Sequence, residues 1–176
     1  MRIARSFSCG VIINGVYSPL DSYPATTRIR PESLERTYYT PRGKIKEIMF
    51  TPVNEEGCLV HMETDTSYAA RLVVNLHTDM RLMWPYDSKA LGGLQFCLSG
   101  DSASLAVSGK ENRFSAAFGG DIPPHKQQVS ASADNRVQWR VTYDLDETNG
   151  HSLNFALAGT RGPRARAVEL KNDLLG

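Results

Sequence analysis

The sequence is poor in cysteine, and the three cysteines that it has, Cys9, Cys58 and Cys97, lie far apart. They form no CxxC motif and have no pair of histidines nearby, which argues against a disulfide scaffold and against a structural zinc site. The four histidines are also scattered, so no helix or strand presents two metal ligands at a short spacing. We therefore expect neither a metal nor a cofactor, and we expect the cysteines to be small apolar residues.

Charge of one sign and long apolar runs are also missing. The 20 Lys and Arg residues almost balance the 19 Asp and Glu residues, for a formal net charge of +1. A chain without a long-range field is not expected to recruit nucleic acid or an anionic membrane. No apolar run approaches the length of about 18 residues that a membrane-spanning helix needs, and the N-terminus lacks the apolar core of a signal peptide. We expect a cytoplasmic protein with neither a membrane nor a nucleic-acid partner.

Motifs for self-contained catalysis are absent as well. The sequence has no Gly-x-Ser-x-Gly elbow, and its glycines form no phosphate-binding loop ahead of a helix. The carboxylates fall mainly at expected turns and outer faces, where Asp is selected for local hydrogen bonding rather than for acid–base work. Nucleophilic hydrolysis and nucleotide binding are therefore excluded, and we assign no catalytic residue.

What the sequence does contain is a series of alternating apolar segments. The chain is organised around 69–93, which begins as an alternating run with Leu72, Val74 and Leu76 on one face and then passes through a polar turn into 80–85. The clearest alternation is 136–146, which we expect to form a hairpin with 153–157 across the turn at 146–150. Its inward residues are expected to be Val137, Trp139, Val141, Tyr143 and Leu145.

Roughly ten short strands and one short helix, at 165–175, predict an all-β, antiparallel β-sandwich. The prolines in 18–31 predict a surface connection there, and 119–126 is expected to be a loop. We expect a β-sandwich domain over 1–160, followed over 161–176 by a linker or the start of a helix that leads to an absent domain.

Aromatic residues outside the core are candidates for stacking on sugar rings, because a pyranose presents an apolar C–H face to a flat ring. Trp84 and Tyr86 flank Pro85 in a break between strands, and Tyr38 belongs to a tyrosine pair. His77 lies on the polar side of the organising run. We expect these four residues to make carbohydrate or interdomain contacts.

Several segments carry a family resemblance: 39–52 (YTPRGKIKEIMFTP), 70–76 (ARLVVNL), 81–85 (RLMWP), 91–93 (LGG) and 112–119 (NRFSAAFG). With them the chain resembles the N-terminal β-supersandwich domain of bacterial glycosidases of the glycogen-debranching and glucoamylase type, which has a galactose mutarotase-like fold. In those glycoside hydrolases the domain precedes a linker helix and an (α/α)6 barrel that holds the catalytic carboxylates. The resemblance implies a noncatalytic domain, or a truncated product of such an enzyme, that packs against a separate or missing barrel.

Two other functions stay open. One is a free-standing carbohydrate-binding module for an α-glucan-like ligand, using Trp84, Tyr86 and Tyr38. The other is a mutarotase-like sugar epimerase, which needs a histidine and a carboxylate that converge on one face. His61, His77 and Glu63 are the residues that could supply such a pair.

Overall fold

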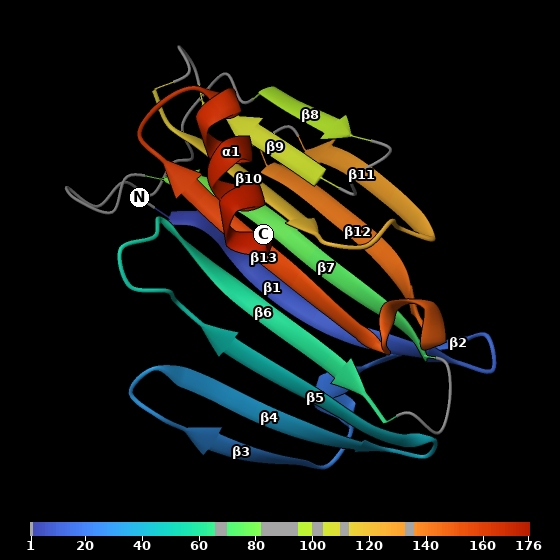
Figure 1. The fold of residues 1–176 in the computed structure, drawn as a ribbon. Helices are drawn as coiled ribbons and strands as arrows, with labels where there is room; N and C mark the ends of the chain where they lie inside the picture. The colour runs from blue at the N-terminus through green and yellow to red at the C-terminus, as the bar shows by residue number, and fades with distance from the viewer. Residues whose placement is uncertain (1, 66–69, 82–94, 100–103, 110–112, 133–135) are drawn as a thin grey trace.

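The computed structural model describes residues 2–65, 70–81, 95–99, 104–109, 113–132 and 136–176. Two antiparallel sheets face each other and enclose one core, with a single short α-helix on the outside (Figure 1). The expected all-β sandwich with a short C-terminal helix is confirmed. Among the described residues no helix is both long enough and apolar enough to cross a membrane.

The five-stranded sheet has the order β11-β12-β7-β1-β2 and the eight-stranded sheet the order β3-β4-β5-β6-β13-β10-β9-β8. The first sheet consists of β1 (Arg2–Ile13), β2 (Val16–Pro19), β7 (Ala70–Arg81), β11 (Lys126–Ser132) and β12 (Arg136–Leu145). The second consists of β3 (Ala25–Ile29), β4 (Ser33–Thr40), β5 (Gly43–Phe50), β6 (Gly57–Thr64), β8 (Gln95–Ser99), β9 (Ser104–Ser108), β10 (Ser115–Gly120) and β13 (Ser152–Thr160).

Strand β7 is the central strand of the smaller sheet, between β1 and β12. Leu72, Val74 and Leu76 are fully buried between the sheets, as their alternation predicts. The polar turn expected before residue 80 is wrong, because β7 continues as a strand paired with β1 as far as Arg81, although the register of the pair shifts between residues 2 and 6 of β1. Of the polar residues in this part of the run, His77 is half-buried on the outer face, whereas Thr78 and Asp79 are fully buried, and the Asp79 carboxylate pairs with Arg2 and Arg136.

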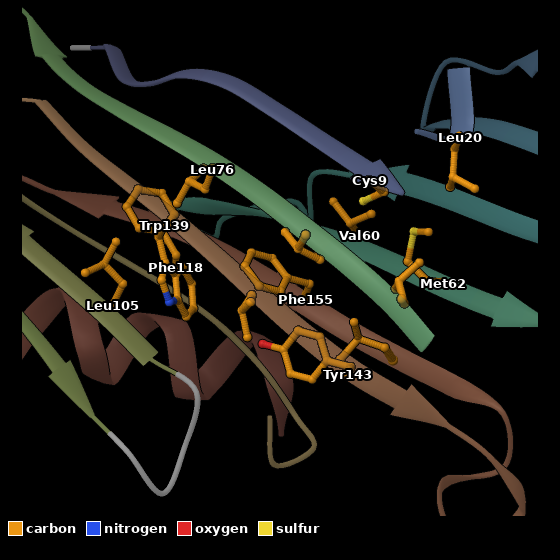
Figure 2. Packing of buried hydrophobic residues seen from close by; sticks show 14 of the residues in the cluster. Cys9, Leu20, Val60, Met62, Leu76, Leu105, Phe118, Trp139, Tyr143 and Phe155 are labelled. Atoms are coloured by element: carbon orange, nitrogen blue, oxygen red, sulfur yellow. The ribbon is translucent and has the colours of Figure 1, made fainter. Parts of the chain in front are cut away.

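An aromatic cluster joins the two sheets in the core (Figure 2). The ring of Phe155, from β13, lies 5.6 Å from that of Phe7, 5.9 Å from that of Trp139 and 6.4 Å from that of Tyr143, measured between centroids. Phe7 belongs to β1, and Trp139 and Tyr143 belong to β12, and both strands are part of the opposite sheet. Trp139 and Tyr143 are therefore core residues, as the alternation of β12 predicts.

The expected hairpin between β12 and β13 is wrong, because the two strands lie in different sheets. The connection is a 3-10 turn, η3 (Glu147–Asn149), whose capping box is built by Asp146 and Asn149, and which ends at Gly150 with φ of 62°. The hydrogen bonds from Thr148 to the Asp146 carboxylate lower the pKa of this group. This rigid turn carries the chain from one sheet to the other instead of folding it back on itself.

Two strands are absent from the sequence-based interpretation. Strand β3 lies within the segment expected to be a surface connection, and β11 follows the expected loop. Both are edge strands, and β3 is flanked by Pro24 and Pro31 rather than interrupted by them. An edge strand hydrogen-bonds on one side only, so prolines beside it cost no hydrogen bond within the sheet.

Helix α1 (Arg164–Leu175) begins within one residue of the expected position and packs on the outer face of the eight-stranded sheet, across β13 and β10 (Figure 1). Small residues make this approach possible: Ala167 packs against Ala106 and Ala117. A Cβ atom added to Gly57 would lie 2.4 Å from a methyl group of Leu174. The helix therefore covers the part of this face over β13 and β10 and does not extend over β3, β4 and β5.

Candidate functional site

The outer face of the five-stranded sheet carries a shallow polar pocket of about 480 Å³. Its side chains come from β7, β11 and β12 and form two rows across the sheet, because the register places outward positions side by side. One row is Gln128, Arg140 and Asn75, and the other is Ser130, Gln138 and His77. We call this surface, with Tyr17 beside it, the β7 face.

Tyr17 is held in a fixed position on the β7 face. Its ring lies directly over Gly10, where an added Cβ atom would come within 2.3 Å of the ring, so only glycine fits there. The Tyr17 hydroxyl accepts a hydrogen bond from Asn75 Nδ2 at 3.1 Å. The guanidinium carbon of Arg140 lies 4.5 Å from the ring centroid, in cation–π distance. These contacts fix the orientation of three planar polar groups on one surface.

A charged group borders the β7 face. The Asp144 carboxylate binds Arg71 Nε at 2.6 Å and His125 Nδ1 at 2.7 Å. These side chains are about two-fifths exposed, so the two contacts orient the groups more than they stabilise the fold. No group of three or more metal-ligating side chains occurs in the described part of the chain. The β7 face thus presents hydrogen-bond donors and acceptors from three neighbouring strands.

The four expected contact residues are not brought together by the described structure. Trp84 and Tyr86 lie outside the described residues. His77 is half-buried on the β7 face. Tyr38 is 3% exposed and lies in the core between the sheets. An enclosed ring offers no platform for a sugar, so we propose no carbohydrate contact for Tyr38.

Tyr38 belongs to a buried polar group instead. Its hydroxyl donates to Glu47 Oε2 at 3.0 Å and accepts from Arg36 Nη1 at 3.2 Å, while Arg36 Nε lies 3.3 Å from the same carboxylate oxygen. Burial and the negative charge of Glu47 raise the pKa of Tyr38. The same carboxylate adds to burial in raising the pKa of the Cys9 thiol. This cluster satisfies polar groups inside the sandwich.

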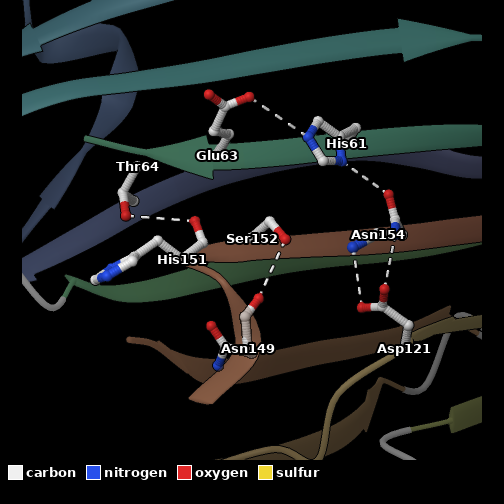
Figure 3. Close-up of polar contacts among 8 residues, drawn as sticks. All are labelled: His61, Glu63, Thr64, Asp121, Asn149, His151, Ser152 and Asn154. Carbon is white, nitrogen blue, oxygen red and sulfur yellow. Dashed lines mark hydrogen bonds and ion pairs between the residues drawn. The ribbon is translucent and has the colours of Figure 1, made fainter. Parts of the chain in front are cut away.

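The three residues considered for a mutarotase-like pair are divided between the two outer faces. His61 and Glu63 lie on the outer face of the eight-stranded sheet, 3.7 Å apart between Nε2 and Oε2 (Figure 3). His77 lies on the β7 face, on the other side of the sandwich. His77 and His61 therefore do not share a site.

Sequence reasoning did not single out Tyr17, Asn75, Gln138 and Arg140 as site residues. The alternation of β7 and β12 assigns the last three to the outer side, but it does not say that these strands are neighbours. The signal for Tyr17 is the Asn14-Gly15 turn, which pairs β1 with β2 and places Tyr17 opposite Ile12.

Comparison with known proteins gives a structural match only. No family model matches this chain, and no curated protein matches it. A bacterial glucoamylase, solved in complex with acarbose, is similar over 99% of this chain and 29% of its own, with a TM-score of 0.71 and 8% sequence identity. A protein from the human microbiome assigned as a kojibiose phosphorylase is similar over 95% of this chain and 24% of its own, with a TM-score of 0.52 and 13% identity.

At these identities the similarity shows the fold alone. The chain spans less than a third of the length of either protein. The described chain thus has the β-sandwich fold of one part of larger carbohydrate-active enzymes.

Proposed function

We propose that this chain is a noncatalytic β-sandwich domain of a glycoside hydrolase, which packs against a separate or missing (α/α)6 catalytic barrel. The observation that carries the proposal is the extent of the structural match: nearly the whole chain aligns with 29% of the bacterial glucoamylase. The segments at 39–52 and 70–76 support the same assignment through the family resemblance. In that family the barrel supplies the catalytic carboxylates, so the sandwich needs none.

The β7 face is the surface that we assign to the contact with the barrel. Helix α1 covers part of the outer face of the eight-stranded sheet, whereas no element of the described chain packs over the β7 face. Interfaces between domains of one protein are more polar than obligate interfaces. The ordered polar groups of Tyr17, Asn75 and Arg140 suit such a contact, because a partner gains hydrogen bonds without having to order these side chains. Trp84 and Tyr86 remain predicted contributors.

Co-expression tests the proposal. The chain is produced alone and together with a candidate (α/α)6 barrel protein from the same genome, and both preparations are assayed for glucose release from maltooligosaccharides. We expect no release by the chain alone, and a copurifying, active complex from the pair. Gln138→Glu with Arg140→Glu should abolish copurification, because the change puts negative charge in the centre of the β7 face. Lys46→Glu, on the opposite outer face, is the matched control and should copurify normally.

Two results would refute the proposal. Glucose release by the purified chain alone would show that the domain is catalytic. Absence of any barrel that copurifies with the chain would remove the packing partner.

A further inference from the structure

Strand β8 is the outermost strand on one side of the eight-stranded sheet. It pairs with β9 along all five of its residues, and no other strand within the described residues hydrogen-bonds to it (Figure 1). In an antiparallel pair every second residue directs its backbone N–H and C=O away from the partner strand. The outer edge of β8 therefore presents backbone donors and acceptors to which a further strand can bind.

The outer strands at the other three edges of the two sheets carry features that discourage pairing with another chain. Charged side chains and prolines on or beside an edge strand have this effect. Strand β3 carries Arg28 and lies between Pro24 and Pro31, β2 ends at Pro19, and β11 begins at Lys126. The sequence of β8, QFCLS, contains neither a charged residue nor a proline. By these criteria β8 is the unprotected edge among the described strands.

The inner side of the sandwich is open at β8. Leu98 packs against the core, and Phe96 points to the same side because it is two residues away along the strand. Phe96 is nevertheless 40% exposed. The five-stranded sheet therefore does not cover β8 completely, which leaves room beside Phe96 for the apolar side chains of a further strand.

A second copy of β8 fits this edge by symmetry. Cys97 is the middle residue of the strand, so an antiparallel pair of two β8 strands centred on it places the two copies of Cys97 opposite each other. Phe96 of each copy then lies opposite Leu98 of the other, which forms two apolar cross-strand pairs. This register suits either set of outward-pointing backbone groups, because both sets are symmetric about the middle residue. Since β8 carries no charge, no like charges are brought together.

We propose that two copies of this chain associate through the outer edges of β8 and form one continuous sheet across the dimer. The two-fold axis is perpendicular to the sheet, so both copies of α1 lie on the same side of it. The contact involves neither the β7 face nor a barrel. Its failure would therefore leave the proposed packing function untouched, and the reverse also holds.

The dimer is expected to be weak. The strand contributes five residues a side, whereas a stable interface has about 20 to 30. We expect a Kd of about 0.1 to 1 mM, which corresponds to about 4 to 5.5 kcal/mol. The chain is then a monomer in the dilute solutions that are used for unfolding experiments.

The first test is sedimentation equilibrium of the whole reduced chain at concentrations on both sides of this Kd, together with its amide NMR signals. We expect a monomer–dimer equilibrium with concentration-dependent shifts centred on β8. Cys97→Lys should weaken association about fivefold, because it places two ammonium groups opposite each other. Cys97→Ser is the matched control at the same position and should associate as the wild type does. Thr27→Lys puts the same charge on β3, the exposed other edge of this sheet, and should have no effect.

The second test uses Cys97 to trap the register. Cys97 is exposed, whereas Cys9 is buried and Cys58 is half-buried. Opposite residues of antiparallel strands have Cα atoms about 4.5 or 5.5 Å apart, and both distances are within the range of about 4.4 to 6.8 Å found in disulfides. With oxidised glutathione, one Cys97 thiolate displaces a glutathione and forms a mixed disulfide, and the second Cys97 thiolate then displaces the other glutathione to give the protein disulfide.

We expect this covalent dimer from the wild type and from Cys58→Ser, and not from Cys97→Ser. Thr27→Cys combined with Cys97→Ser places an exposed thiol on β3 and measures cross-linking by random collision, which should be much slower. The proposal is overturned if the chain stays monomeric at millimolar concentration, if Cys97→Lys associates as Cys97→Ser does, or if the thiol on β3 cross-links equally fast. Shifts of the β8 signals that appear only when another protein is added would assign this edge to a different partner and would also overturn it.

Discussion

Truncation of Phe155 tests the sandwich architecture at the point where the two sheets meet. The ring is fully buried and contacts three aromatic rings of the opposite sheet, at centroid distances of 5.6 to 6.4 Å. Phe155→Ala removes the apolar area of one ring, leaves a cavity and breaks these contacts, at a cost of about 3 to 5 kcal/mol. Phe155→Leu retains most of the volume and should cost about 1.5 kcal/mol or less.

The assay is equilibrium unfolding in urea, followed by circular dichroism. Phe96→Ala, which truncates an exposed ring, should change the free energy of unfolding by about 0.5 kcal/mol or less. A double-mutant cycle between Phe155 and Trp139 should show a coupling energy of about 0.5 to 1.5 kcal/mol, since these rings belong to opposite sheets and touch. A loss for Phe155→Ala as small as that for Phe96→Ala would refute the packing described for the core.

Three further predictions concern glycine, lysine and glutamate positions, and each is measured by urea unfolding unless stated otherwise. Gly57→Ala should lower the free energy of unfolding by about 1 to 3 kcal/mol, because its Cβ would clash with a leucine of α1 and with a backbone carbonyl, whereas Gly162→Ala, with open space around it, should be nearly neutral. Burial lowers the pKa of Lys171, so between this lowered pKa and the ordinary value of lysine the unfolded chain binds more protons than the folded chain. The free energy of unfolding should therefore rise with pH in that window. Lys171→Met should remove this pH dependence and should raise the free energy of unfolding by about 1 kcal/mol at a pH below the window. Glu47→Gln should lower the free energy of unfolding by about 2 kcal/mol, because it weakens the contacts of Glu47 with Tyr38 and Arg36. In the folded wild type, a spectrophotometric titration should find Tyr38 still protonated at a pH where exposed tyrosines ionise, because burial and Glu47 raise the pKa of Tyr38. Equal stability of the two glycine variants, no difference in pH slope for Lys171→Met, or ionisation of Tyr38 together with the exposed tyrosines would contradict the respective argument.

The strands with a clear apolar face could be predicted from the sequence. The alternation in β7 and β12 identifies Leu72, Val74, Trp139 and Tyr143 as buried, and the structure confirms all four. Period-two patterning determines which side of a strand is buried, because every second side chain points the same way. It contains no information about which strand lies alongside, and this is why the expected hairpin between β12 and β13 is wrong.

The strands that the sequence did not reveal are polar edge strands. Every residue of β3 is exposed, so the segment has no apolar face that could produce a pattern. Its hydrogen bonds to β4 supply the order instead. From its sequence pattern a short polar segment of this kind is predicted to be a loop, unless the strand that pairs with it is known.

The candidate surfaces depend on contacts between distant parts of the chain. His77 could be assigned to a polar outer face, but its neighbours Gln138 and Ser130 come from strands that only the tertiary fold brings beside it. The side-chain hydrogen bond between His61 Nδ1 and Asn154 Oδ1 joins residues that are 93 positions apart in the chain. The choice between Tyr38 and Tyr39 illustrates the same limit, since their exposure follows from which side of β4 faces the other sheet.

The most direct test of the proposed domain function is hydrogen–deuterium exchange of the chain with and without the candidate barrel protein from the same genome. We predict that the partner slows exchange at the ends and edge of the β7 face, in β11, β12 and β7, and leaves β4 and β5 unchanged. The Gln138→Glu and Arg140→Glu double variant should show no such protection. Protection confined to β4, β5 and β6, or none on any strand, would contradict the assignment of this chain as a domain that packs through its five-stranded sheet.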